Sequence, residues 1–229
     1  MKRPLLGIIG GMGAQATACF YEKLHRRQNI TKEQDYLDIL LYSIPSTPDR
    51  TAYITGQSIE NPLKNLIHAA TTLESAGATC IAIPCVTSHY FYEDLVNAVN
   101  IPILNMLDET ARFAAAQVNF IRPNNKIMLL ATDGTIKGGA FHSSFKKYNI
   151  EVITPQEAEQ QKLMTLIYDI KRGVDISANT IDTIIREASK TEAGAVVLGC
   201  TELCITAEEI PGTINTLDVL AGASIAMRK

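Results

Sequence analysis

Short apolar runs alternate with longer amphipathic stretches along the whole chain. The runs are continuous rather than interrupted by polar residues, as is typical of parallel strands that are buried on both faces of a sheet. Eight runs predict strands, at residues 5–9, 38–42, 79–83, 101–104, 126–131, 150–154, 195–199 and 212–216. Because amphipathic helical stretches separate these runs, the pattern predicts an α/β fold in which helices cover parallel sheets.

Two of the predicted helices have clear end signals. Asn61 and Pro62 offer a cap and a first-turn proline, and predict a helix over 62–75. The segment 154–157 has the pattern of a capping box with proline at the first helical position, and predicts a helix over 155–172. Each of these helices is followed closely by a glycine, the residue that most often ends a helix.

The two halves of the chain resemble each other at an offset of about 110 to 116 residues, which is too long for a solenoid repeat and suits two related half-size domains. The matching stretches are "LLGIIGGMG" (5–13) with "IMLLATDGT" (127–135), "AGATCIAIPCVT" (76–87) with "AGAVVLGCT" (193–201), and "IPILNMLD" (101–108) with "IPGTINTLD" (210–218).

This repeat predicts two pseudo-symmetric lobes, each a parallel sheet flanked by helices. The first lobe is expected to comprise residues 1–104 plus 217–229, and the second lobe residues 105–216. The last helix, over 218–228, would then return to the first lobe. Open α/β sheets bind ligands at the carboxyl ends of their strands, so the active site is expected in the cleft between the lobes.

Composition excludes several classes of partner. The chain has 229 residues, 46% hydrophobic and 20% charged, with a net charge of −3, which is typical of a globular protein. No stripe of Lys and Arg favours nucleic acid, and no apolar run reaches the roughly 18 residues that cross a membrane. The first 18 residues loosely resemble a signal peptide, but glycines interrupt their apolar run. An odd count of five cysteines favours reduced thiols in the cytoplasm.

Two cysteines stand at matching places in the repeat. Cys85 and Cys200 each follow a predicted buried strand, and a threonine lies within two residues of each. Since the carboxyl ends of parallel strands line the ligand crevice, the two thiols are expected to face each other there. A thiolate on one side of a carbon atom and a thiol on the other could remove and return a proton, and this exchange would invert the carbon.

The surroundings of these cysteines leave alternatives open. A helix N-terminus after each cysteine would lower the pKa of its thiol, although a cysteine at a strand end is often only a small buried hydrophobe. A disulfide is compatible with the spacing. His89, one helical turn after Cys85, either tunes the thiol or hydrogen-bonds a loop. Zinc is disfavoured because no Cys-x2-Cys pair is present, so we expect no metal. The remaining cysteines are interpreted as structural: Cys19, Cys80 and Cys204.

The glycine-rich turn at 10–16 contains Gly11-x-Gly13-x-x-Ala16 after a predicted strand, as dinucleotide-binding proteins do. Asp38, however, opens the second strand instead of ending it, which is the wrong place for contact with a ribose. We therefore expect the turn to let the backbone approach a small carboxylate, with a nucleotide-linked oxidoreductase as the alternative.

Two basic residues are candidates for binding an acidic substrate. Arg50 lies in a loop after the second strand, and arginine makes bidentate contacts to carboxylates. The alternative is an ordinary solvated surface charge. Lys171 lies near the end of a long predicted helix, a position that the helix dipole alone would favour.

Six stretches spread over nearly the whole chain are "GIIGGMG" (7–13), "PDRTAYI" (48–54), "PCVTSHYF" (84–91), "ATDGTIKGG" (131–139), "IYDIKRG" (167–173) and "LGCTEL" (198–203). Together they resemble the aspartate/glutamate racemases, a family of cofactor-independent amino-acid racemases. The last stretch resembles the aspartate-racemase branch more than the glutamate-racemase branch, where a histidine usually follows the threonine.

The resemblance implies a two-lobed homodimeric enzyme that works without a cofactor on a small amino acid. Cys85 and Cys200 would be the two acid/base groups on opposite faces of the substrate Cα. Other residues would surround the substrate: Val86, Thr87, Thr135 and Thr201 at its α-carboxylate and amino end, Met12 over it, Arg50 and Lys171 at its distal carboxylate, and Glu202 behind the second cysteine.

Two departures from the family pattern bear on the substrate. Val86 stands where the family has an asparagine whose amide usually reaches the substrate, and Ala14 stands where proline is common. Hydantoin racemases and maleate isomerases share the two-cysteine layout and are alternatives, as is a non-catalytic protein that binds a dicarboxylate. Because Arg50 favours a dicarboxylate, the predicted function is racemisation of acidic amino acids, aspartate first and glutamate second.

Overall fold

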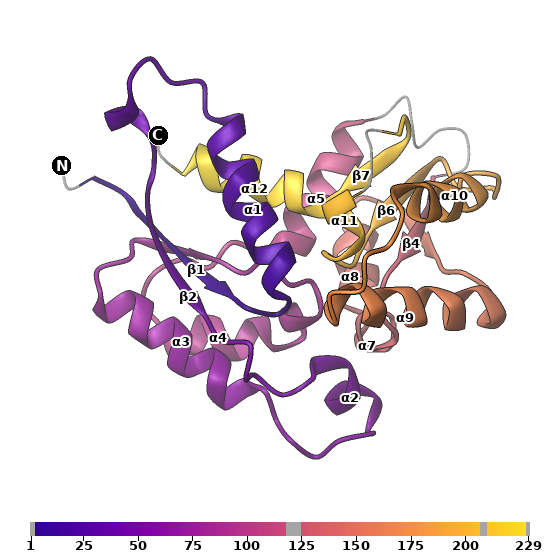
Figure 1. Cartoon of the computed structure of the whole chain (residues 1–229), viewed down its shortest axis with the longest axis horizontal. Coiled ribbons are helices and arrows are strands. Elements are labelled where there is room, and N and C mark those ends of the chain that lie inside the picture. The colour runs from indigo at the N-terminus through magenta and orange to yellow at the C-terminus, as the bar shows by residue number, and fades with distance from the viewer. Residues whose placement is uncertain (1–2, 118–124, 207–209, 228–229) are drawn as a thin grey trace.

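The computed structural model describes residues 3–117, 125–206 and 210–227, and has two parallel sheets flanked by helices (Figure 1). The predicted α/β fold with two lobes is therefore confirmed. Seven of the eight predicted strands are present in the described part of the chain, with ends that differ from the prediction by one residue at most.

The first sheet has the order β2-β1-β3 and is formed by β1 (Leu5–Gly10), β2 (Asp38–Ser43) and β3 (Cys80–Ala82). The strand predicted over 101–104 is wrong, because this run forms only an isolated parallel bridge between Ile81 and Ile103. Two backbone hydrogen bonds hold it, from Ile81 N–H to the Pro102 carbonyl and from Leu104 N–H to the Ile81 carbonyl. Proline has no N–H to donate, which limits the run to this short ladder.

The second sheet has the order β5-β4-β6-β7 and is formed by β4 (Lys126–Leu130), β5 (Glu151–Ile153), β6 (Ala195–Leu198) and β7 (Thr213–Asn215). Its strands follow one another in the same spatial order as those of the first sheet, with the bridge at Ile103 in the place of β7. The internal repeat in the sequence therefore corresponds to a repeated sheet topology.

The helices cover both sheets, and Figure 1 shows α3 and α4 on one side of the first sheet with α1 and α12 on the other. Their bounds are α1 (Ala14–Arg27), α2 (Arg50–Thr55), α3 (Leu63–Ser75), α4 (Tyr92–Ala98), α5 (Met106–Ala116), α7 (Asp133–Gly138), α8 (Ala140–Lys146), α9 (Glu157–Lys171), α10 (Ala178–Ala188), α11 (Leu203–Thr206) and α12 (Thr216–Ala226), with 3₁₀ turns η1 (Glu33–Asp35) and η2 (Thr87–Phe91).

Both predicted helices are present, but α3 begins one residue and α9 two residues later than predicted. The Asn61 side chain accepts a hydrogen bond from the Leu63 N–H at 2.9 Å, at the start of α3. Helix α9 begins at Glu157, two residues later than predicted, and its cap Gln156 makes no side-chain capping bond. The capping box is absent because the chain stays extended through Gln156, so that Thr154 lies outside the helix.

The repeated Asn-x-Leu-Asp segments begin two helices that connect the halves. Asn105 caps α5 by accepting hydrogen bonds from two backbone N–H groups, and Asn215 caps α12 in the same way. Helix α12 packs against α1 and α5, and α5 packs against α8. Lys23 of α1 forms an ion pair with Asp218 of α12 at 2.7 Å. The assignment of residues to lobes stays a prediction, and residues 1–2 and 228–229 lie outside the described residues.

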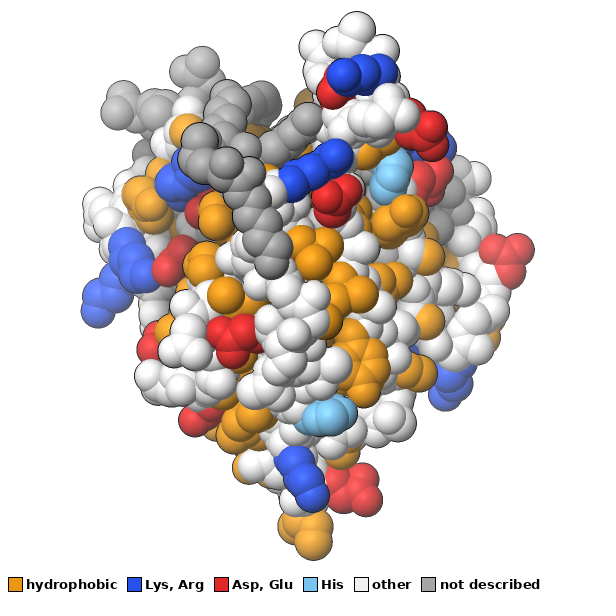
Figure 2. Space-filling view, turned by 90° about the vertical axis from the view of Figure 1, so that its left-hand side faces the viewer, with side chains coloured by type: hydrophobic (Ala, Val, Ile, Leu, Met, Phe, Trp, Pro, Cys, Tyr) orange, Lys and Arg blue, Asp and Glu red, His pale blue; other side chains and the backbone are white. Residues whose placement is uncertain are grey.

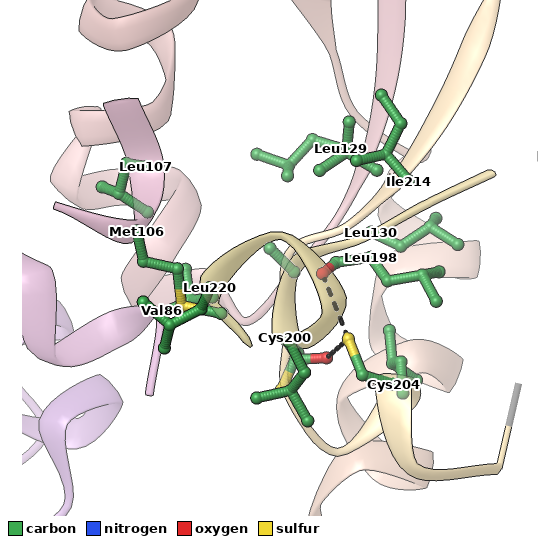
Figure 3. Close-up of a cluster of buried hydrophobic side chains, with 14 of the residues drawn as sticks. Val86, Met106, Leu107, Leu129, Leu130, Leu198, Cys200, Cys204, Ile214 and Leu220 are labelled. Atoms are coloured by element: carbon green, nitrogen blue, oxygen red, sulfur yellow. Dashed lines mark hydrogen bonds between the residues drawn. The ribbon is translucent and has the colours of Figure 1, made fainter. Parts of the chain in front are cut away.

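Two hydrophobic clusters form the core. The larger extends from the first sheet to the second and includes Val86 and Cys200, which Figure 3 shows among leucines and methionine of both halves. The smaller lies between the first sheet and helices α3 and α4. On the outside, Figure 2 shows hydrophobic side chains gathered on the face at the left of Figure 1. The edge strand β2 lies in this half, and its Leu41 is 42% exposed.

Candidate active site

The two candidate cysteines lie just beyond equivalent strands. Cys85 follows β3 and Cys200 follows β6, each at the carboxyl end of its sheet. Their exposed fractions are 5% and 4%, so both thiols are buried. Burial alone is also what a structural cysteine shows, so the chemistry depends on the groups around each sulfur.

A carboxylate contacts the sulfur of Cys200. The Cys200 thiol donates a hydrogen bond to Glu202 Oε2 at 2.9 Å. Burial, followed by the charge of Glu202, raises the pKa of the Cys200 thiol well above its usual value. The expected lowering by a helix N-terminus is therefore wrong for this cysteine. The nearest helix, α11, has only four residues and begins three residues later, so its N–H groups offset little of the burial.

Glu202 also connects the two sheets through the glycine-rich turn. The Gly13 N–H donates to Glu202 Oε1 at 3.1 Å, so the turn does bind a carboxylate, one supplied by the protein itself. A Cβ atom on residue 13 would lie 2.9 Å from the same oxygen, so a larger residue there would displace the Glu202 carboxylate. Asp38 begins β2, as the sequence indicated, and pairs with Arg3 away from the turn.

The surroundings of Cys85 are different. His89 Nδ1 lies 3.0 Å from the Cys85 carbonyl oxygen, and Met106 N–H donates to His89 Nε2 at 3.1 Å. Because Nε2 accepts, Nδ1 carries the proton and donates to the carbonyl. Burial lowers the pKa of His89, which favours this neutral form. The loop-binding alternative for His89 is therefore the one that the structure supports, and Val86 is buried in the core beside it.

Threonines from both halves meet near these cysteines. The Thr87 hydroxyl lies 2.9 Å from the Thr135 hydroxyl and 3.0 Å from that of Thr132. Thr87 belongs to η2, which follows Cys85, and Thr135 belongs to α7, which follows β4. Thr201, next to Cys200, donates to Glu202 Oε2 at 3.4 Å. Met12 is buried and accepts a hydrogen bond at its sulfur from the Ser88 hydroxyl at 3.6 Å.

The two candidate cations lie close to each other across the halves. Burial lowers the pKa of Lys171, but negative charge on Glu202, Cys200 and Cys85 outweighs this effect, and the pKa is raised. Arg50 acts on the same ammonium group in the opposite direction. Lys171 is thus within electrostatic range of Arg50, Glu202 and both thiols. The fold therefore brings together residues that lie far apart in the sequence, between positions 50 and 202.

Arg50 is a buried, hydrogen-bonded side chain rather than a solvated surface charge. It is buried at the start of α2, and its Nη1 donates to the carbonyl oxygens of Thr47 at 3.3 Å and Pro48 at 3.1 Å. Its Nε is buried without a hydrogen-bond partner among the described residues. A buried guanidinium N–H without a partner is costly, so this donor is suited to a ligand oxygen.

The Arg50 helix is fixed to the second half of the molecule. Asp49 caps α2 through the Ala52 N–H at 2.8 Å and accepts a hydrogen bond from the Tyr168 hydroxyl of α9 at 3.1 Å. Burial raises the pKa of Asp49, but the bond from Ala52 and the charge of Lys171 outweigh it and the pKa is lowered. Lys137 of α7 adds a hydrogen bond to the Thr55 carbonyl at 3.1 Å.

Sequence reasoning missed three residues of this arrangement. Asp49 and Tyr168 join α2 to α9, and Thr132 joins the threonine cluster. A signal for Thr132 was available, because a threonine directly after a buried strand and before a glycine-containing turn is a typical helix cap. Nothing in the sequence pairs Asp49 with Tyr168, since their contact depends on how the halves meet.

Other candidates for chemistry lie apart from this site. Within residues 3–117, 125–206 and 210–227, no three His, Cys, Asp or Glu side chains are arranged to hold a metal ion, and no helix could span a membrane. All five cysteines are free, and burial raises the pKa of Cys80 and of Cys204 to about 11. A cavity of about 1020 Å³ between α1, α5, α12 and β7 contains none of the predicted site residues.

Fold and site together define a two-lobed α/β protein with a buried cysteine after an equivalent strand of each sheet. The chain belongs to the Asp/Glu/Hydantoin racemase family, whose sequence profile matches residues 9–229. This finding confirms the resemblance seen in the sequence motifs.

Individual relatives cover almost the whole chain. It is 27% identical over 222 residues to the broad specificity amino-acid racemase RacX of Bacillus subtilis (strain 168), covering 93% of this chain and 92% of the relative. Picrophilus torridus aspartate racemase matches with a TM-score of 0.84 and 30% identity, over 98% of this chain and 94% of that one. An aspartate racemase homologue from Pyrococcus horikoshii OT3 matches with a TM-score of 0.77 and 26% identity, over 100% and 99%.

Proposed function

We propose that this protein is a cofactor-independent racemase that inverts the Cα of acidic amino acids, aspartate first and glutamate second. The observation that carries the proposal is the pair of buried thiols, Cys85 and Cys200, which follow equivalent strands and act on one ammonium group, that of Lys171. Membership of the racemase family and the similarity to the aspartate racemase of Picrophilus torridus support it.

The proposed reaction is a proton exchange on opposite faces of one carbon. A thiolate takes the Cα hydrogen of one enantiomer as a proton, and the electron pair of the broken C–H bond stays on the substrate. The opposite thiol then gives its proton to the other face of the carbon and becomes the thiolate. Atoms and charges balance within the pair, and the next substrate of the opposite hand restores the starting state.

The two cysteines are proposed to rest in different protonation states. Cys200 has a carboxylate acceptor for its S–H proton at 2.9 Å and is proposed as the resting acid. Cys85 makes no side-chain hydrogen bond within the described part of the chain, so no side-chain acceptor holds a proton on its sulfur there. Cys85 is therefore proposed as the resting base.

The substrate class follows from the two cations. Arg50 offers a buried N–H with no partner among the residues that the structure describes, and Lys171 offers an ammonium group nearby. This combination suits the distal carboxylate of a dicarboxylic amino acid. Thr87, Thr135, Thr201, Val86 and Met12 are proposed to surround the α-carboxylate and amino end. Burial of these residues excludes water, which strengthens each electrostatic contact.

Neutral amino acids are the second candidate substrate class. The relative from Bacillus subtilis is described as a broad specificity amino-acid racemase. Val86 packs in an apolar cluster at the position where the resemblance to the racemase family implies an asparagine, so one polar contact that would select a substrate is proposed to be missing. A broad substrate range is the expected consequence of that loss.

Proton NMR in heavy water tests the proposal. Incubation of L- and D-aspartate, L-glutamate and L-alanine with the protein is expected to remove the Cα–H signal, fastest for aspartate. An Arg50→Met variant should lose aspartate exchange and keep most of its alanine exchange, because only aspartate has a distal carboxylate. Ligand binding without any exchange would instead identify a non-catalytic binding protein.

A homodimer in a reducing compartment such as the cytoplasm completes the proposal. The exposed edge strand β2 and the apolar face in Figure 2 offer a surface for a second copy, since an unpaired strand edge is a template for pairing. Sedimentation equilibrium is expected to give twice the 25.0 kDa chain mass, and a monomer at micromolar concentration would contradict this part.

A further inference from the structure

Three threonine hydroxyls from the two halves form a closed triangle. The Oγ1 atoms of Thr87 and Thr132 are 3.0 Å apart, those of Thr87 and Thr135 are 2.9 Å apart, and those of Thr132 and Thr135 are 3.1 Å apart. Each distance lies within hydrogen-bond range. The cluster is therefore one network, and it connects the segment after Cys85 to the start of α7.

Thr132 differs from its two partners in exposure and in bonding. It is 0% exposed, whereas Thr87 and Thr135 are 7% and 6% exposed. Its Oγ1 also accepts the backbone N–H of Thr135 at 3.2 Å, as the cap of α7. All contacts of the Thr132 hydroxyl therefore lie inside the protein, and this hydroxyl has no path to a substrate.

The number of protons limits what the triangle can do. Each hydroxyl has one proton and two lone pairs, and one lone pair of Thr132 is used by the Thr135 N–H. When Thr132 donates its proton to one partner, that oxygen has a donor from inside the protein, and a carboxylate can accept the protons of both Thr87 and Thr135. Without Thr132, each of these two hydroxyls has only the other as an inward partner, at 2.9 Å, so a bond between them competes more strongly with the carboxylate for one of the two protons.

We propose that Thr132 is a positioning residue that directs the hydroxyl protons of Thr87 and Thr135 at the α-carboxylate of the substrate. The inference rests on the proposed racemase function. Removal of the Cα proton moves negative charge onto the α-carboxylate, so donors aimed at it bind the transition state more strongly than the ground state. Loss of Thr132 should therefore lower kcat more than it raises KM.

The test is the isosteric variant Thr132→Val, with Thr110→Val as its matched control. Thr110 is also 0% exposed and donates its hydroxyl to a backbone carbonyl, that of Met106 at 2.7 Å, in helix α5. Both variants lose one buried hydroxyl and should show similarly lower melting temperatures. For aspartate, T132V is expected to lower kcat about tenfold with KM changed by less than about twofold, whereas T110V keeps both.

Rescue separates positioning from general structure. Thr132→Ser restores the hydroxyl and is expected to restore kcat to within about twofold of the wild-type value. If T132V does not fold, Thr132→Ala takes its place with the same expected loss of kcat. An unchanged kcat in T132V, or a rise in KM alone, would overturn the inference and leave the racemase function standing. Absence of Cα–H exchange in the wild-type protein would overturn both.

Discussion

Cys85 and Cys200 occupy equivalent places in the repeated sheets, yet their neighbours differ in kind. After Cys85 comes the apolar Val86, and His89 binds the backbone rather than the sulfur. After Cys200 comes the polar pair Thr201 and Glu202, and the carboxylate accepts the thiol proton directly. The repeat therefore reproduces the position of the sulfur but not its chemical surroundings.

This difference separates two properties that a two-base racemase needs. A symmetric backbone places one thiol after each sheet, so that each can serve one face of a carbon. Asymmetric side chains then surround the two thiols, and on the proposed mechanism the resting protein starts with one acid and one base. If the surroundings were also symmetric, the state with one thiol and one thiolate would have no preferred arrangement.

Replacing either cysteine should have the largest effect. Cys85→Ser and Cys200→Ser are each expected to lower racemisation of aspartate on the order of 1,000-fold, because a hydroxyl is a far weaker base than a thiolate. Cys204→Ser is the matched control, since its buried thiol contacts backbone carbonyls and the Thr216 hydroxyl, all of which a serine hydroxyl can also bond. Chiral chromatography of the product measures the rate. Wild-type rates in either single variant would refute the two-base assignment.

The substitution Glu202→Gln should make the surroundings of the Cys200 thiol more like those of the Cys85 thiol. The amide keeps the size of the side chain but has no negative charge, so the raised pKa of the Cys200 thiol should fall. Alkylation of residue 200 by iodoacetamide, followed by peptide mass spectrometry, should show a midpoint at lower pH. Racemisation is expected to fall about tenfold, as for loss of one aligned hydrogen bond to a charged group. Glu74→Gln, whose carboxylate caps Asn100 elsewhere, should leave the midpoint unchanged.

Stability should respond to the same thiol in alkaline solution. The pKa of Cys200 is higher in the folded protein than in the unfolded chain, so the folded state holds its proton more tightly. This contribution is fully present below the unfolded pKa near 9 and is lost as pH rises through the folded pKa. In urea unfolding above pH 9, Glu202→Gln should therefore lose less stability per pH unit than the wild-type protein.

Val86→Asn should make the two motifs more alike. A side-chain amide at position 86 would offer the substrate one hydrogen bond, and KM for aspartate is expected to fall about fivefold. The melting temperature should drop by a few degrees, because the amide replaces a buried apolar side chain. Val86→Ala is the control without an amide and should give no gain in affinity. An unchanged KM in the asparagine variant would show that residue 86 does not reach the substrate.

The smallest effect is expected for the two asparagines that cap the helices connecting the halves, Asn105 at α5 and Asn215 at α12. Asn105 and Asn215 each accept two backbone hydrogen bonds with matching geometry, so Asn105→Ala and Asn215→Ala are each expected to cost about 1 kcal/mol of unfolding free energy. Chemical denaturation measures both. The exposed Asn97→Ala in α4 should change stability by less than about 0.5 kcal/mol. If one substitution cost much more unfolding free energy than the other, the two halves would differ in the stability of their caps as well as in the residues around their thiols.

Local patterns were sufficient where the physics is local. Buried parallel strands require continuous apolar runs, which could be read from the chain. The asparagine caps need only residues two and three positions away, but they were not predicted, and α12 begins at Thr216 rather than at residue 218. The sequence patterns gave wrong predictions where another local preference determined the backbone structure. The run at 101–104 contains a proline that cannot donate to a ladder, and the start of α9 lies two residues beyond the proline that was expected to open it.

The sequence by itself determined the repeat, the parallel sheets and the placement of one cysteine after an equivalent strand of each half. Only the tertiary structure decided that Glu202 binds Gly13, that Thr132 joins Thr87, and that Asp49 meets Tyr168. The physical reason is distance along the chain: these partners lie on different elements, and a hydrogen bond of about 3 Å depends on how two separately formed sheets dock. The contact between the Cys200 thiol and Glu202 is therefore set within one motif, whereas the contacts that join the two halves are set at that junction.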